Sequence, residues 1–225
     1  MTTTTVHMNY RKLLSFVVAL AFVVSLAPAA FAEGEDLANG EAVFNTCTPC
    51  HGAAGEGTDL ASAPAIAGLP QWYVEVQLDK FQNGARGKHP DDVEGLRMRP
   101  MARSLMDSKR FSAARVKDVA AYVASLPVVE TPHTVEGNAE NGKALYTPCI
   151  ACHGQAGQGS QPLGGPPLVG QSDWYLESSI HKFQSGVRGG DPSKDQSGAI
   201  MAAMSNTLTD DKIKDVIAYI RTLGE

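Results

Sequence analysis

Two short motifs could carry the chemistry of this 225-residue chain. CTPCHG occupies residues 47–52 and CIACHG occupies residues 149–154, and these two motifs hold all four cysteines. In Cys-x-x-Cys-His the two thiols can add to the vinyl groups of a haem, and the neighbouring imidazole can bind its iron from below. The residues expected to bind two haems in this way are Cys47, Cys50 and His51 in the first motif and Cys149, Cys152 and His153 in the second.

The same cysteines allow other chemistry. Each pair could form a disulfide or a thioredoxin-like redox pair, and two Cys-x-x-Cys pairs together resemble a zinc ribbon. A disulfide leaves the histidine after each pair without a role. The usual spacing between zinc-binding pairs is short, whereas these pairs begin 102 residues apart (149 − 47). Two covalently attached haem c groups are therefore the preferred interpretation.

A haem iron with one histidine ligand has a second axial position, and methionines are the candidates for it. Residues 98–105 and 201–208 share the pattern Met-x-x-Met-x-x-x-Leu. The alternative is that these methionines only fill irregular cores, but that would scatter them along the helices instead of grouping them. A thioether ligand would keep the iron low-spin and stabilise its reduced state.

The elements that must position these residues occur twice. Shifted by 102 positions, the chain aligns with itself, and 18 of the 41 residues from 47 to 87 are identical. Each half predicts a helix before the haem motif (36–46 and 138–147), a second helix (71–83 and 173–185) and a last helix with an apolar stripe of 3.6-residue period (112–126 and 209–223). Thr209 is a good N-cap for the last helix, and Ser112 takes that part less clearly. The fold class is all-α.

The N-terminal segment and the segment between the two repeats predict the domain organisation. A basic pair at 11–12, an apolar run at 13–26 and Ala-Phe-Ala at 30–32 predict a signal peptide over 1–32, with an uncleaved anchor as the alternative. A first domain then covers 33–127, a proline-bearing linker 128–137 and a second domain 138–225. Export to the periplasm follows, and any membrane association would come through the start of the chain.

Charge excludes one class of partner. Without residues 1–32 the chain has 17 basic and 24 acidic residues, a formal charge of −7. Nucleic-acid binding needs a basic surface, so no nucleic-acid partner is expected.

On these motifs the chain resembles the di-haem cytochrome c₄ type, a duplicated class I cytochrome c. The stretches PAIAGLP and PPLVGQ resemble that family's loop after the haem motif, and LTDDKIKDVIAYI resembles its C-terminal helix. The resemblance implies two tandem class I cytochrome c domains, each a small helical bundle around a covalent haem. In that family the ligand methionine stands eight residues before the cap of the last helix, which selects Met201 from Thr209. An insertion spoils this count in the first half, where alignment of the methionine block selects Met98.

The resemblance also implies roles for residues outside the motifs. Met101 and Met204 are the second choices for the axial ligands. Family members use a proline carbonyl to orient the proximal imidazole, and Pro64 and Pro166 match that position. Arg86 and Arg188 recur in both halves and could pair with haem propionates, with solvated loop charges as the alternative.

The expected function is transfer of single electrons, without a catalytic residue. Donors would be a quinol-oxidising complex or an exported dehydrogenase, and acceptors a terminal oxidase or reductase. One alternative is a permanently bound cytochrome c subunit of a membrane respiratory complex. Another is a di-haem peroxidase-like enzyme, which would need an iron with an open or displaceable face.

Overall fold

The computed structural model describes residues 2, 35–106 and 115–224. Apart from residue 2, the predicted signal peptide 1–32 lies outside these residues, and so does the predicted cap Ser112. The described regular structure is helical, with two isolated β-bridges, which confirms the all-α prediction.

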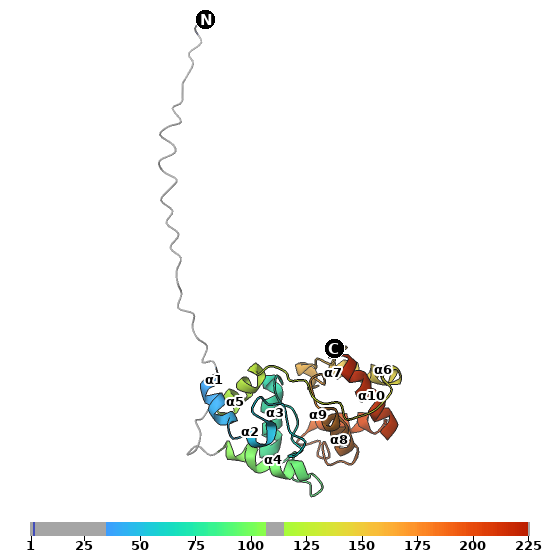
Figure 1. The fold of residues 1–225 in the computed structure, drawn as a ribbon, viewed down its shortest axis with the longest axis horizontal. Coiled ribbons are helices and arrows are strands. Elements are labelled where there is room, and N and C mark those ends of the chain that lie inside the picture. Colours follow the sequence, from blue (N-terminus) through green and yellow to red (C-terminus); the bar gives the residue numbers. More distant parts are fainter. Residues whose placement is uncertain (1, 3–34, 107–114, 225) are drawn as a thin grey trace. The chain divides into compact units, whose positions relative to one another are not determined.

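Five α-helices follow one another in the same order in each described half (Figure 1). Those of the first half are α1 (Leu37–Phe44), α2 (Thr48–His51), α3 (Gln71–Asn83), α4 (Val93–Ser104) and α5 (Arg115–Ser125). Those of the second half are α6 (Ala139–Tyr146), α7 (Ile150–His153), α8 (Asp173–Gln184), α9 (Gln196–Ser205) and α10 (Asp210–Thr222). Short 3₁₀ turns, η2 (Thr147–Cys149) and η3 (Gln161–Leu163), add to the second half.

In both halves the first helix crosses the last helix at a glycine. A Cβ on Gly40 of α1 would lie 2.8 Å from the carbonyl carbon of Asp118 in α5. A Cβ on Gly142 of α6 would lie 2.6 Å from the carbonyl carbon of Asp215 in α10. Only glycine allows the two backbones to approach this closely. The aromatic residue four positions after each glycine lies on the same helix face and packs on a tyrosine of the last helix. Phe44 packs on Tyr122, and Tyr146 packs on Tyr219.

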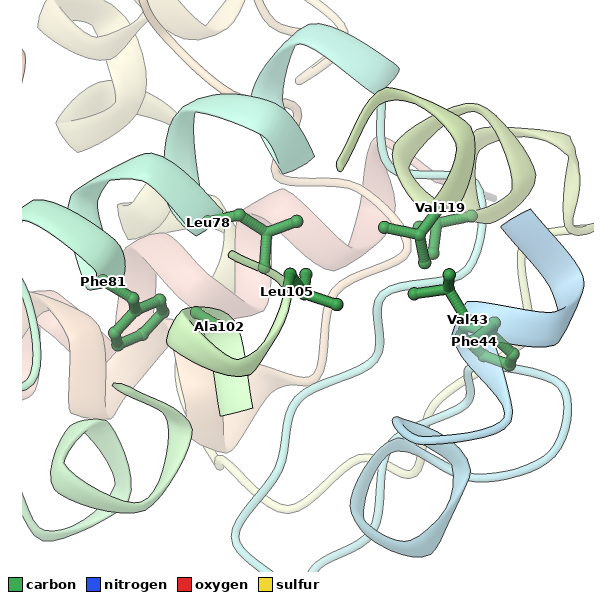
Figure 2. Packing of buried hydrophobic residues seen from close by; sticks show 8 residues of the cluster. Val43, Phe44, Leu78, Phe81, Ala102, Leu105 and Val119 are labelled. Atoms are coloured by element: carbon green, nitrogen blue, oxygen red, sulfur yellow. The ribbon is translucent and has the colours of Figure 1, made fainter. Parts of the chain in front are cut away.

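Each half builds its own core around that crossing. In the first half the buried members come from α1, α3, α4, α5 and the residue after α4, and their packing is drawn in Figure 2. They are Val43, Phe44, Leu78, Phe81, Ala102, Leu105, Val119 and Val123. The second half repeats this core with Val135, Tyr146, Leu176, Ile180, Ile213, Val216, Ile217 and Ile220. The apolar stripe of α10 supplies four of these residues, as its period predicts.

The methionine blocks lie on helices that the sequence did not predict. Asp92 caps α4 and Asp195 caps α9, each by accepting a hydrogen bond from the backbone NH three residues later. Pro100 lies inside α4 and would ordinarily disfavour a helix there. Thr209 lies at the N-cap of α10 with extended backbone angles, but its side chain makes no capping hydrogen bond.

The segment between the halves has no helix, but it is attached to the second half. Val135 is buried in the second core. Asp173, at the start of α8, accepts hydrogen bonds from the backbone NH groups of Thr134 (2.6 Å) and Val135 (2.9 Å). These bonds fix the path by which the chain enters α6.

Residues 35–225 belong to one compact unit, and hydrogen bonds join its two halves. The side-chain amide of Gln171 donates to the carbonyl oxygen of Ala65 at 2.9 Å. Two ion pairs also cross between the halves.

Candidate haem-binding sites

Each Cys-x-x-Cys-His motif forms a single helical turn that follows directly from the first helix of its half. Cys47 is the N-cap of α2, which contains Cys50 and His51, and Cys149 precedes α7 in the same way. No disulfide joins any of the four cysteines, all of which lie among the described residues. Burial raises the pKa of the thiols of Cys47 and Cys149.

Both motif histidines are buried and point one ring nitrogen at a proline carbonyl. His51 Nδ1 lies 2.9 Å from the carbonyl oxygen of Pro64, and His153 Nδ1 lies 2.8 Å from that of Pro166. A carbonyl can only accept, so Nδ1 carries the proton and Nε2 keeps its lone pair for a metal. Burial lowers the pKa of both imidazoles, although the bond to the carbonyl opposes this, and they remain neutral as a metal ligand must be.

The loop after each motif folds back to bring the proline into place. The backbone NH of Gly57 donates to the carbonyl oxygen of His51 at 2.7 Å. Gly57 has a φ of 81°, and a Cβ there would lie 2.6 Å from the backbone nitrogen of Ala65. Glycine is therefore required for the turn that carries Pro64 past the histidine. Gly159 makes the same bond to His153 in the second half.

The four candidate methionines differ in burial. Met98 of α4 is half-buried and packs against the first core, and Met201 of α9 packs against the second. Met101 and Met204 are exposed, at 43% and 39%. Each helix therefore has one methionine packed against the core of its half and another that is exposed.

Arg86 and Arg188 are buried, at 8% and 7% exposure, so the alternative of solvated loop charges is wrong. Each guanidinium lies 4.3 Å above a phenylalanine ring, Phe81 or Phe183. Their Nη atoms bond to uncharged side chains, and both Nε atoms are buried without a hydrogen-bond partner among the described residues. A buried guanidinium with an unsatisfied donor calls for an anion. Carboxylates such as the haem propionates fit that requirement.

The tyrosines that follow the repeated tryptophans lie beside these two arginines, and the sequence did not predict this. Arg86 Nη2 lies 3.4 Å from the hydroxyl oxygen of Tyr175. Burial alone would raise the pKa of Tyr175, but Arg86 and Arg188 together lower it to about 7. The repeated pair Trp-Tyr at 72–73 and 174–175 was the signal available in the sequence.

The part of the chain that the structure describes has no cluster of His, Cys, Asp and Glu side chains that could hold a metal ion. No three His, Cys, Asp or Glu side chains converge within 35–106 and 115–224. A zinc ribbon built from the two cysteine pairs is therefore not assembled in this part of the chain.

Comparison with known proteins decides the family. The cytochrome c family model matches residues 37–127 and again residues 139–224. The chain belongs to the cytochrome c family. Because the match occurs twice, each time over one Cys-x-x-Cys-His motif, this cytochrome carries two covalently attached haem c groups, as predicted.

Individual relatives show which members of the cytochrome c family this chain is similar to. A protein of Stutzerimonas stutzeri (strain A1501) named "thiosulfate dehydrogenase electron acceptor" is 32% identical over 80% of this chain and 79% of its own. Cytochrome c4 of Azotobacter vinelandii is 28% identical over 92% of this chain and 97% of its own. The structure of Acidithiobacillus ferrooxidans cytochrome c4 superposes with a TM-score of 0.61 at 27% identity, covering 79% of this chain and 98% of that one.

These likenesses confirm the cytochrome c₄-like assignment and the tandem arrangement of two cytochrome c domains. They also support an electron-transfer role for this di-haem cytochrome. None of the helices in the described residues is long and apolar enough to cross a membrane.

Proposed function

We propose that this cytochrome is a periplasmic carrier that moves single electrons from an exported dehydrogenase or a quinol-oxidising complex to a terminal oxidase or reductase. The observations that carry the proposal are the buried imidazole and the core-packed methionine of each half. One buried imidazole with a free Nε2 and one inward-facing thioether would occupy both axial positions of an iron. A site filled on both faces suits electron transfer and leaves no face for a substrate.

The proposed ligands are His51 with Met98 and His153 with Met201. The haem bound there supplies a one-electron iron couple. The protein's own residues hold the two ligands in place, exclude water and supply buried positive charge through Arg86 and Arg188. The surface positions of Met101 and Met204 support their place as second choices.

The proposed donor follows from the relative in Stutzerimonas stutzeri, whose name describes it as an acceptor for thiosulfate dehydrogenase. An exported dehydrogenase of that kind is therefore our first candidate. The basic n-region and apolar run at 11–26 support export to the periplasm.

Anaerobic mixing experiments test this assignment. The oxidised cytochrome is mixed with a thiosulfate dehydrogenase and thiosulfate, and separately with a quinol-oxidising complex and quinol, while its reduction is followed optically. We expect rapid reduction in the first mixture that requires both enzyme and substrate. Reduction only by the quinol-oxidising complex would reassign the donor, and turnover of hydrogen peroxide by the reduced protein would replace the carrier proposal with the enzyme alternative.

A further inference from the structure

Two partly buried ion pairs join the halves in a crossed pattern. Lys80 of α3 lies 2.7 Å from a carboxylate oxygen of Asp195, at the start of α9 in the other half. Lys182 of α8 lies 2.7 Å from a carboxylate oxygen of Asp92, at the start of α4. The two lysines are equivalent in the repeat, 102 positions apart. All four side chains are at most 20% exposed, so solvent and salt screen these pairs much less than surface pairs.

The two carboxylates are the N-caps of the helices that carry the candidate ligand methionines. Asp195 accepts from the backbone NH of Gly198 at 2.7 Å, and Asp92 accepts from that of Gly95 at 3.2 Å. A Cβ on Gly198 would lie 2.5 Å from the carboxyl carbon of Asp195. Glycine at the third helical position therefore lets the carboxylate sit directly over the helix start. In both halves the methionine follows the cap by six residues (98 − 92 and 201 − 195).

Among the described residues, the partners of both lysine ammonium groups belong to the opposite half. Besides Asp195, Lys80 donates to Ser197 Oγ at 3.1 Å, and besides Asp92, Lys182 lies 2.6 Å from Glu94. Both additional partners belong to the first turn of the capped helix. A buried carboxylate that loses its counter-charge is strongly destabilised, so each cap depends on a lysine from the other half.

We infer that Lys80 and Lys182 are crossed positioning residues, each of which holds the methionine-bearing helix of the opposite half in place. This inference rests on the proposed function, with Met98 and Met201 as axial ligands. Lys80 then controls the setting of Met201, and Lys182 controls that of Met98. Docking of the two halves and the ligand field of each iron are coupled through these two side chains.

The test compares Lys80→Gln and Lys182→Gln in the full haem-loaded protein, with Lys194→Gln as the matched control. Lys194 pairs with Asp191 on the surface and stands one residue before Asp195, so its loss removes the same charge from the same region without touching the cap. Hydrogen–deuterium exchange of peptides covering α4 and α9 reports on each helix separately. Carbon monoxide binding and the two reduction potentials report on each iron, assigned with Met98→Ala and Met201→Ala proteins.

We expect a crossed result. Lys80→Gln should speed exchange of α9 by about tenfold or more and leave α4 unchanged, because opening of the helix no longer costs a buried ion pair. It should also lower the potential or admit carbon monoxide at the second haem alone. Lys182→Gln should do the same to α4 and the first haem, and Lys80→Arg should restore the native behaviour.

Several results would overturn the inference. One is an effect in the half that contains the mutated lysine, and another is an effect no larger than that of Lys194→Gln. If Lys80→Gln does not fold, a Lys80→Arg protein that also fails to fold would count against the inference. Failure of the proposed function looks different. Carbon monoxide would then bind the wild-type protein at both irons, while the exchange experiment could still show or refute the crossed dependence of α4 and α9.

Discussion

Replacing Gly142 by alanine tests the helix crossing on which the second haem site is built. The new Cβ would overlap the carbonyl group of Asp215, lying 2.6 Å from its carbon, and would lie 2.8 Å from the Cβ of Tyr219. Overpacking typically costs about 1–3 kcal/mol, and the upper end applies here because the obstacle is backbone. Alanine recovers about 1 kcal/mol through its better helix propensity. The expected net loss of unfolding free energy is about 2 kcal/mol, or roughly 4–8 °C in melting temperature for a unit of this size.

Guanidinium unfolding of the haem-loaded protein, followed by circular dichroism, measures this loss. Ala144→Gly is the matched control, because Ala144 is exposed on the same helix and reports the propensity difference alone, about 1 kcal/mol. We expect Gly40→Ala to behave like Gly142→Ala in the first half. A Gly142→Ala protein as stable as the wild type would show that α6 and α10 do not cross at the distance described, and would refute the reasoning.

Two further predictions concern the second half. Asp173→Asn should cost about 1.5–3 kcal/mol, because it removes the charged acceptor for the backbone and hydroxyl of Thr134. Burial would raise the pKa of Asp173, but these hydrogen bonds hold it below its ordinary value of 3.8. The stabilisation by Asp173 is therefore present above pH 3.8 and is lost as the pH falls through the lower pKa of the folded state. The free energy of unfolding of the variant should depend less on pH in this acid range. An unchanged pH dependence would contradict this. Tyr146→Phe should cost about 1 kcal/mol, because the hydroxyl donates to the carbonyl oxygen of Gly154 at 2.8 Å. The pKa of Tyr146 is raised to about 12, chiefly by burial, so the hydroxyl keeps its proton in mild alkali. Denaturation curves at neutral and mildly alkaline pH should therefore show the same loss of unfolding free energy in the variant. A loss that vanishes in mild alkali would be evidence against this hydrogen-bond donor.

The sequence predicted the parts of the fold that depend on local pattern. The helix predicted at 71–83 is α3, and the helix predicted at 173–185 ends one residue earlier as α8. Caps at Asp36 and Asn138 begin α1 and α6 where the repeat places them. These elements were predictable because the two halves repeat the same local pattern.

The helices around the methionines were not predicted, since their local signals conflict. Pro100 lies inside α4, and α9 mixes glycine, alanine and methionine without a polar face. What stabilises both is an aspartate cap held by a lysine from the other half, and no local pattern reveals a partner about a hundred residues away. The candidate ligands were found by repetition of the methionine block, not by recognition of the helix that carries it.

Burial of Arg86 and Arg188 was missed for a similar reason. Both arginines directly precede a glycine within a loop, a context in which a charged side chain is usually solvated. The structure places each one over a phenylalanine from the preceding helix, with the Nε inside the protein. A charge that recurs in both halves of a duplicated chain was the available hint.

The ligand set of each iron is the central claim, and one measurement tests it most directly. Haem is counted per chain in the purified protein, and the reduced spectrum is recorded before and after addition of carbon monoxide. The wild type is compared with Met98→Ala and Met201→Ala, and with Met101→Ala and Met204→Ala as surface controls. We predict two low-spin haems that ignore carbon monoxide in the wild type and both controls, and one carbon-monoxide-reactive haem in each of the first two variants. A carbon-monoxide-reactive haem in the wild type, or in a surface control but not in its buried counterpart, would contradict the account.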